Sequence, residues 1–388
     1  MNIYVLNKEF QKIDIVEHYA SFIWTIRYLE AGDFEMVIND QNALANLQIG
    51  NYILCDAFYK DDIAPLMIIE SIEIEKNDTS DDIRISGRDL KSILDRRIVW
   101  GSTIFNSGDL LKNVITKIFD DNIKNPPDWE KEYIHSDQQT VKIKIEGAYR
   151  RIDNFVIDNR SLSLDSILID EEKQYNGETV YDVFCDLLSY FYLGFDVLYN
   201  FEKNQMFFTV LELTDRTTKQ FIKEPLIFSS NLDNFKNGRY IYSQTNEKNT
   251  ALLIGEKYEE SDQYNVMYNI LEFQVSGLDR RETSIDVSSV SRINEETQKE
   301  YGNLEYLSML KDKGIEELNK MKQVIKYDGV VNETSGYEYL KDYSIGDICE
   351  IYDDYGNSNF VYIEEVVMSV STNGYTIIPT FSTLDNED

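Results

Sequence analysis

Two short segments repeat the residue types best suited to ionic chemistry. The letters LDRR occur at residues 94–97 and again at 278–281, so each copy places two arginines directly after an aspartate. A guanidinium group can hold a phosphate or a carboxylate through two parallel hydrogen bonds. The repeat could therefore form a phosphate clamp, a catalytic site or a structural contact between strands. The four candidate residues are Arg96, Arg97, Arg280 and Arg281.

The supply of charged partners favours the structural interpretation. The chain of 388 residues has 70 Asp and Glu against 38 Lys and Arg, a formal net charge of −32. Carboxylate partners are therefore plentiful, whereas phosphate binding needs dense Lys and Arg. We interpret the four arginines as binding carboxylates, either locally at sheet edges or across a subunit boundary, and the sequence leaves both open. A surface this acidic also predicts that DNA can pass it without specific binding.

Residues for enzymatic chemistry are few. The only histidines are His18 and His135, and no GxSxG, HExxH, GxGxxG or phosphate-loop motif is present. A triad or zinc site would need one of these histidines with partners that the sequence does not reveal. Cys55, Cys185 and Cys349 are too far apart in sequence for a metal knuckle. We therefore predict that the chain is not an enzyme and holds no cofactor and no metal.

The abundant carboxylates leave two further interpretations. The letters YDDYGNSN at 352–359 resemble an oxygen-rich calcium loop, but the EF-hand spacing and its terminal Glu are missing. We interpret this segment as a hairpin turn. A glycosidase pair of carboxylates stays undecided at this point, because the separation of such a pair in space, not in sequence, defines it.

The elements that must position the arginines are mostly strands. Residues 1–100 contain short β-branched or aromatic runs separated by polar turns, which predicts a β-barrel-like module. Within it, isoleucine and glutamate alternate from Ile69 to Glu75 with a one-residue shift at Ser71. Such a shift predicts a β-bulge.

Helical periodicity appears after Trp100. Residues 101–215 form a predicted α+β insertion domain, with helices near 108–122 and 179–193 and a hairpin over 195–213. The second helix begins at Thr179, which is spaced from Asp182 as in a capping box.

The rest of the chain is again rich in strands. Residues 216–330 predict a second β-rich module that ends in a long helix from Asn303 to about Ile325, with Leu304, Leu307, Leu318 and Met321 facing inward. Residues 331–388 predict a C-terminal β region that packs on this module or completes it. Since βα units do not alternate regularly, the fold class is α+β, mostly β.

No segment predicts membrane insertion or export. No apolar run approaches 18 residues, and the first residues lack a basic region followed by an apolar one. We expect synthesis in a bacterial cytoplasm.

An ordered set of motifs resembles the distal tail proteins of siphophages. The set spans residues 21–381 in order, and no single block carries the resemblance alone. The matched residues are Trp24, Arg27, Tyr28, Gly32, Asp33, Phe34 and Glu35, then Ser86, Gly87, Arg88, Leu94, Asp95, Arg96, Arg97 and Trp100. Further blocks are LGF (193–195), NTALLIGE (249–256), SGLDRRE (276–282), DYSIGD (342–347) and GYTIIPTF (374–381).

The resemblance implies a structural role. This family is similar to the baseplate or tail-hub proteins of contractile phages and related injection systems. It implies a homotrimeric ring at the end of the tail tube, with two tube-like β-barrel modules in each subunit. Three subunits would then present six barrels to the sixfold tube and threefold symmetry to the distal components. The expected localisation is the virion tail of a phage, a prophage or a phage-derived particle.

The resemblance also implies partners. These are the tail tube or a distal tail protein, the tape-measure protein, and the spike, fibre or lysin proteins. Because the chain stops directly after its last strand, we expect a separate protein to supply cell-wall cleavage and receptor contact. Residues 124–160 are longer and more polar than the family pattern, which suggests an adapter role for them.

Two other functions compete with a tail hub. One is a carbohydrate-binding or carbohydrate-cleaving tail module, which tryptophans grouped in a groove with a carboxylate pair would favour. The tryptophans are instead scattered along the sequence, at residues 24, 100 and 129. The other is a toxin-delivery or immunity adapter that shares the hub fold, which the sequence does not separate from a hub.

Overall fold

A computed structural model describes the chain except for a set of short segments. These are residues 40–43, 77–80, 135–139, 159–163, 170–171, 261–262, 273–274, 295–298, 323, 332–335, 353–357, 372–373 and 385–388. His135 and most of the segment 352–359 lie outside the described residues.

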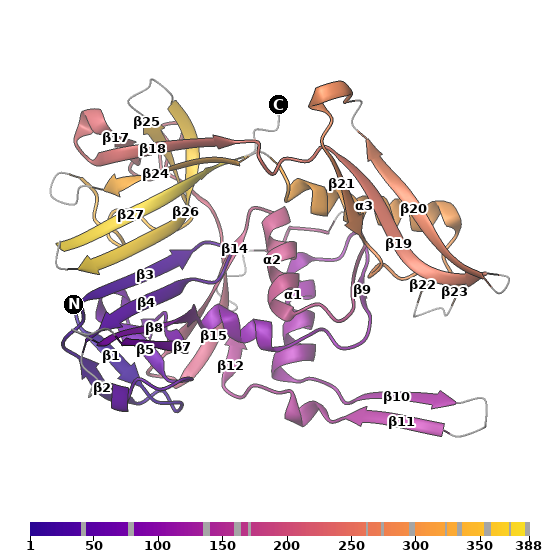
Figure 1. The fold of residues 1–388 in the computed structure, drawn as a ribbon, viewed down its shortest axis with the longest axis horizontal. Helices are drawn as coiled ribbons and strands as arrows, with labels where there is room; N and C mark the ends of the chain where they lie inside the picture. Colours follow the sequence, from indigo (N-terminus) through magenta and orange to yellow (C-terminus); the bar gives the residue numbers. More distant parts are fainter. Residues whose placement is uncertain are drawn as a thin grey trace.

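One large sheet contains strands from both ends of the chain (Figure 1). Its path of hydrogen-bonded strands is β18-β24-β27-β26-β3-β4-β8-β7-β5-β1-β2, and β25 pairs with β16, β17 and β26 beside it. The strands are β1 (Ile3–Leu6), β2 (Lys12–Val16), β3 (Ser21–Arg27), β4 (Asp33–Ile38), β5 (Tyr52–Cys55), β7 (Met67–Lys76), β8 (Asp81–Asp89), β16 (Thr214–Asp215), β17 (Ile227–Ser229), β18 (Phe235–Ser243), β24 (Val324–Val331), β25 (Asp347–Tyr352), β26 (Ser358–Ser371) and β27 (Gly374–Thr383).

The two β-rich ends of the chain are joined by the pairing of β26 with β3. This antiparallel pairing runs from Glu365 opposite Arg27 to Ser371 opposite Ser21. A buried core of aromatic and aliphatic side chains spans the join and includes Trp24, Phe228 and Phe381. The fold is mostly β, as predicted. In the described part of the chain, however, the strand path has two open ends and no closed barrel is found.

A mixed α/β region packs against the first strands and has its own core around Phe119, Phe184 and Phe208. Helix α2 (Val180–Tyr190) is capped by the predicted Thr179, whose side chain accepts a hydrogen bond from the Asp182 amide at 3.0 Å. The elements of this region are η3 (Leu90–Arg96), β6 (Ile63–Ala64), β9 (Thr103–Phe105), α1 (Leu111–Phe119), η4 (Asp120–Lys124), β10 (Trp129–Ile134), β11 (Thr140–Ile145), η5 (Gly147–Tyr149), β12 (Phe155–Ile157), β13 (Lys173–Tyr175), α2 (Val180–Tyr190), β14 (Gly194–Asn200) and β15 (Gln205–Leu211).

Strands β10 and β11 form a two-stranded hairpin that projects from this region (Figure 1). It falls within residues 124–160, the segment that is unusually long and polar in sequence. Cross-strand ion pairs join Lys142 to Glu130 and Lys144 to Asp128 along it.

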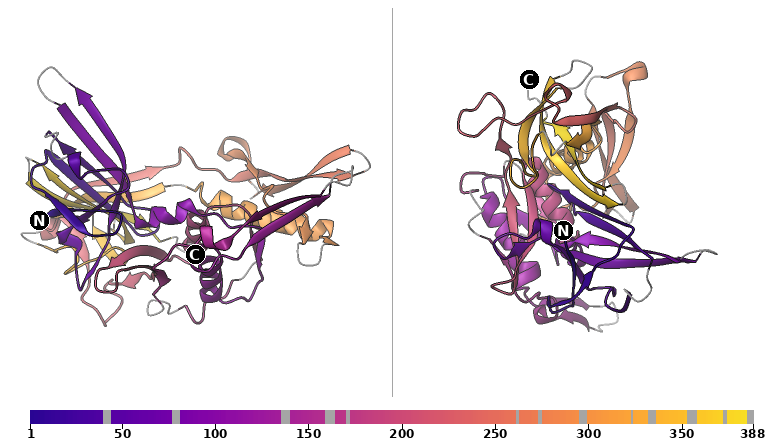
Figure 2. Two further views of the ribbon diagram at one scale, coloured as in Figure 1. Left: turned by 90° about the horizontal axis from the view of Figure 1, so that it is seen from below. Right: turned by 90° about the vertical axis from the view of Figure 1, so that its left-hand side faces the viewer.

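A third unit consists of residues 250–319, and we call it the outer module. Helix α3 packs on a three-stranded sheet of order β20-β19-β21. Figure 2 shows the outer module and the large sheet at opposite ends of the molecule. Its elements are β19 (Thr250–Glu260), β20 (Gln263–Glu272), η8 (Gly277–Asp279), β21 (Glu282–Asp286), β22 (Ile293–Asn294), β23 (Lys299–Glu300) and α3 (Asn303–Asn319). Two further 3-10 turns among the described residues are η2 (Asp56–Phe58) and η7 (Ser230–Leu232).

The long helix differs from its sequence prediction in length and, in its first turn, in orientation. It ends at Asn319, because β24 begins at Val324 and takes the rest of the expected helix into the sheet. Its buried face consists of Tyr306, Leu310, Gly314 and Leu318. Leu304, predicted to face inward, is 85% exposed because it lies in the first turn, off this stripe.

Candidate functional site

The first arginine pair is positioned by a bulge and a short 3-10 helix. The β7–β8 register shifts between Ile69 and Ser71, which leaves Glu70 without a partner in the ladder and confirms the predicted bulge. Glu70 accepts hydrogen bonds from Arg88 Nε at 2.8 Å and from Arg88 Nη2 at 3.2 Å. Arg96, at the end of η3, places its Nη2 3.6 Å from the same carboxylate. The bulged glutamate thus holds the strand end and the 3-10 helix together.

Arg97 contacts a different part of the chain. Its Nε donates to the Arg150 carbonyl at 2.8 Å, and Nη1 donates to the Arg96 carbonyl at 2.9 Å. The buried Arg150 guanidinium lies 5.2 Å from the centre of the Trp100 ring, which meets Trp129 edge to face at 5.4 Å. Burial and the neighbouring Arg96 lower the pKa of Arg97. Arg97 is therefore fixed at the base of the β10–β11 hairpin.

The second arginine pair lies at the start of β21, after a second 3-10 turn. Arg280 forms ion pairs with Glu282, at 2.5 Å, and with Glu272 at the end of β20. Arg281 Nη1 donates to the Gln244 carbonyl at 2.7 Å and to the Glu247 carboxylate at 2.6 Å. Arg281 therefore links the outer module to residues 244–247, which connect β18 to the module.

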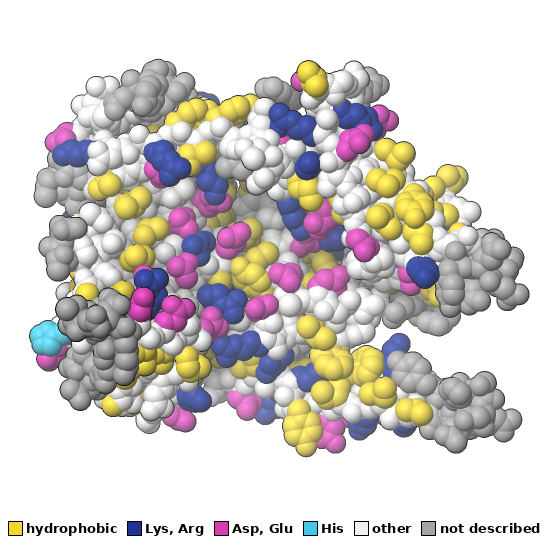
Figure 3. Space-filling model, viewed as in Figure 1, with side chains coloured by type: hydrophobic (Ala, Val, Ile, Leu, Met, Phe, Trp, Pro, Cys, Tyr) yellow, Lys and Arg dark blue, Asp and Glu magenta, His cyan; other side chains and the backbone are white. Residues whose placement is uncertain are grey.

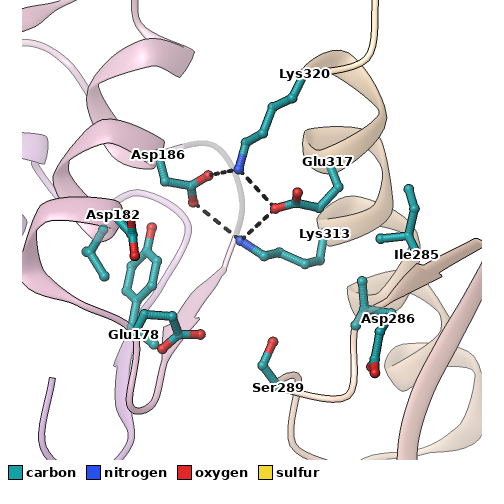
Figure 4. Close-up of a pocket in the computed structure, with 12 residues that line it drawn as sticks. Glu178, Asp182, Asp186, Ile285, Asp286, Ser289, Lys313, Glu317 and Lys320 are labelled. Atoms are coloured by element: carbon teal, nitrogen blue, oxygen red, sulfur yellow. Dashed lines mark hydrogen bonds and ion pairs between the residues drawn. The ribbon is translucent and has the colours of Figure 1, made fainter. Parts of the chain in front are cut away.

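A charged junction, which sequence reasoning missed, connects α2 to α3 (Figure 4). Asp186 on α2 lies 3.4 Å from Lys313 Nζ and 3.0 Å from Lys320 Nζ. These lysines also pair with Glu317, and Glu316 on the same helix pairs with Lys173 of β13 at 3.3 Å. In sequence, the alternating charges of α3 are typical of a solvated helix face. Only the tertiary fold shows that Asp186 lies opposite them.

The carboxylates of this junction differ in their proton affinity. Burial, then a hydrogen bond to Asp186 and the negative charge of Asp186, raise the pKa of Glu316. Burial alone would raise the pKa of Asp186 as well. The hydrogen bond from Glu316 and the ammonium groups of Lys313 and Lys320 outweigh it, and they hold that pKa below its ordinary value. Of these two buried carboxyl groups, Glu316 therefore holds a proton more tightly than Asp186.

A cavity of about 310 Å³ lies at the same junction. Figure 3 shows a recess between the outer module and the rest of the protein, surrounded by side chains of both charges. The charged side chains that line the cavity are Glu178, Asp182, Asp186, Asp286, Lys313, Glu317 and Lys320.

The structure does not assemble the other candidates into one site. His18 is exposed, Cys55 and Cys349 are buried and Cys185 is half-buried. Among the described residues, no group of three or more His, Cys, Asp or Glu is placed to hold a metal ion. Within those same ranges, no helix has both the length and the apolar character needed to cross a membrane.

Comparisons with known proteins agree with this architecture. The chain spans the full length of the 43 kDa tail protein of prophage MuSo2 from Shewanella oneidensis, at 15% identity and a TM-score of 0.53, with 100% of both chains covered. The tail protein from Neisseria meningitidis MC58 matches at 13% identity and a TM-score of 0.49, over 99% of this chain and 96% of that one. A search of curated proteins found no match.

The family comparison covers almost the whole sequence. Residues 2–382 match the family model described as Siphovirus ReqiPepy6 Gp37-like protein. The resemblance to siphophage tail proteins is confirmed, and the chain belongs to the Siphovirus ReqiPepy6 Gp37-like protein family.

Proposed function

We propose that this protein is a structural component of the tail tip or baseplate of a phage or phage-like particle. The observation that carries the proposal is a family match over residues 2–382 together with a fold shared end to end with a prophage tail protein. The architecture suits such a role, because one sheet links both β-rich ends of the chain into a single wall. The localisation that we propose is the virion tail.

In this proposal the protein forms a homotrimeric hub. Each subunit contributes two tube-like β modules, one from residues 1–100 and one from the strands that residues 216–330 and 331–388 add to the large sheet. Residues 101–215 form the domain that lies between them in sequence, and the outer module lies apart from both. The ring adapts the sixfold tube to threefold distal components and lines a channel for DNA and the tape-measure protein. A net charge of −32 supports this, since an acidic wall repels DNA and does not retain it.

The partners of the hub follow from this placement. The tail tube or a distal tail protein binds above the ring, and spike, fibre or lysin proteins bind below it. The chain itself carries no catalytic activity in this proposal. Zymography of the purified protein on peptidoglycan should show no lysis, and lysis that persists after removal of contaminants would contradict the non-enzymatic role.

Imaging of assembled particles tests the proposal. We expect electron cryomicroscopy of tails produced from the intact gene cluster to show three copies around a central channel at the distal end. Tails from a cluster with this gene deleted serve as the control and should lack that ring. A peripheral fibre, or a ring of six copies, would overturn the trimeric hub.

A further inference from the structure

The chain enters and leaves the outer module at one place, the paired ends of two neighbouring strands. Strand β18 ends at Ser243 and β24 begins at Val324, and these two residues pair in the large sheet. The whole module is therefore an insertion between two adjacent strands. The connections that enter and leave it run side by side, because the Lys248 amide donates to the Met321 carbonyl at 2.9 Å.

The outer module has its own hydrophobic core. The buried cluster formed by Leu253, Leu271, Tyr306 and Leu310 shares no member with the two cores of the rest of the protein. Close contact between α3 and the sheet is possible because Gly314 faces Leu253, where a Cβ atom would lie 2.5 Å from the leucine methyl carbons. A unit with its own core and a narrow attachment can move as one body.

Polar contacts hold the module against α2 and β13. Besides the contacts of Asp186 with Lys313 and Lys320, the Tyr301 hydroxyl donates to Glu172 at 3.2 Å. The side chains of Asp186, Glu316 and Lys173 are only 8–11% exposed. Ionic contacts of this kind require defined geometry, and the groups regain their hydration when they separate. An apolar interface would instead resist opening, because separation exposes it to water.

The entering connection is clamped to the module. Arg281 binds both Gln244 and Glu247, and the Asn249 side chain accepts a hydrogen bond from the Arg281 amide at 2.8 Å. This clamp leaves the strand ends near Ser243 and Val324 as the points about which the module could turn. This assigns Arg281 a role at the hinge within one chain.

We propose that residues 250–319 form a hinged module that is latched onto α2 by Lys313 and Lys320 through Asp186, and that it swings about the ends of β18 and β24 when these ion pairs separate. The cavity at the junction fits such an opening, since water already has space between the two surfaces. The inference concerns the isolated chain and is independent of the proposed tail function.

Distance measurements between two spin labels test the latch. One label is placed on the module at Leu278→Cys and the other on the mixed α/β region at Tyr149→Cys, since both positions are highly exposed. Cys185→Ala removes the half-buried native thiol. The labelled protein should give one narrow distance distribution. The double variant Lys313→Met with Lys320→Met should add a second population at a different distance.

Two further variants complete the test. Lys341→Met removes an exposed lysine that pairs with Glu338, and it should leave the distribution unchanged. Asp186→Asn removes the negative charge that the two lysines bind and keeps the size of the side chain. If the double variant does not fold, the distance distribution of this variant provides the test. An unchanged single distribution in whichever folded latch variant is measured would overturn the proposal.

Discussion

At the residue scale, the arginine repeats show which contacts can be predicted from residue types alone. The acidic composition predicts carboxylate partners, and in the structure Arg96, Arg280 and Arg281 have carboxylate oxygens within ion-pair distance. Arg97 instead contacts carbonyl groups. Whether any of the four also binds a second subunit stays a prediction, because the contacts described here lie within one chain.

The shared carboxylate of Glu70 should contribute measurably to stability. It is 27% exposed and contacts two guanidinium groups, so Glu70→Gln should lower the free energy of unfolding by about 1–2 kcal/mol, above the value for a typical exposed pair. Urea unfolding measures this. Glu73→Gln, an exposed glutamate on the same strand, is the matched control and should change stability by less than about 0.5 kcal/mol. Equal effects of the two substitutions would show that the bulge contact is unimportant.

The carboxyl groups of the junction should make stability depend on pH. Because folding raises the pKa of Glu316, its stabilising contribution is present at low pH and is lost as the pH rises through that raised pKa. Asp186 has the opposite sign: its lowered pKa stabilises the fold above the ordinary range of an aspartate, and that contribution is lost in acid.

We therefore expect the free energy of unfolding to decrease between about pH 5 and about pH 8 more steeply in the wild type than in Glu316→Gln. Glutamine mimics the protonated acid, so the variant lacks this titration. The comparison is made by urea unfolding at a series of pH values, with Glu338→Gln as a surface control. Identical pH profiles for the wild type and Glu316→Gln would contradict the raised pKa of Glu316.

At the element scale, local signals were reliable and element ends were not. The bulge at Ser71 and the cap at Thr179 depend on neighbouring residues, so the sequence pattern predicted both. The end of α3 depends instead on the pairing of β24 with β18 and β27, which are distant in sequence. The contact of α3 with Asp186 is long-range in the same way, since nothing in the sequence near α3 reveals that Asp186 lies opposite it.

The close approach of strands β7 and β8 requires a glycine at position 87. A Cβ atom at this position would lie 1.7 Å from the Ile68 carbonyl oxygen, a backbone atom that cannot move without breaking the pairing. Gly87→Ala should therefore lower the free energy of unfolding by about 3 kcal/mol or more. Gly302→Ala is the control, because its nearest atom lies 4.0 Å away and the expected cost is only about 0.5–1 kcal/mol, from the poorer N-cap. Thermal unfolding that shows equal shifts would contradict this account.

At the scale of the whole molecule, the decisive contacts are long-range. The pairing of β26 with β3 joins residues more than 300 positions apart, and no periodicity within either strand indicates its partner. The sequence predicted β-rich blocks at both ends but not their union in one sheet. The family resemblance predicted the class of protein because an ordered set of motifs preserves such long-range information.

The last prediction concerns assembly and returns to the four arginines. If at least one pair also contacts a neighbouring subunit, Arg→Ala variants should assemble poorly while the isolated chain stays folded. Arg96 is the best placed of the four, because its side chain is 50% exposed and its carboxylate partner lies 3.6 Å away, which leaves donors free for a second partner. Within the isolated chain this exposed pair should contribute only ~0–1 kcal/mol.

Particle assembly and thermal unfolding of each single variant separate the possibilities. Arg84→Ala is the control, since Arg84 is similarly exposed at 55% and pairs with Glu35 at 3.4 Å outside the repeats. A loss of particles with an unchanged melting temperature would place the arginine at the subunit boundary. A lower melting temperature with normal assembly would confine its role to one chain. If neither particle assembly nor the melting temperature changes in any of the four variants, the repeats have no structural function. The interpretation that these arginines stabilise the protein or its assembly through carboxylate contacts would then be wrong.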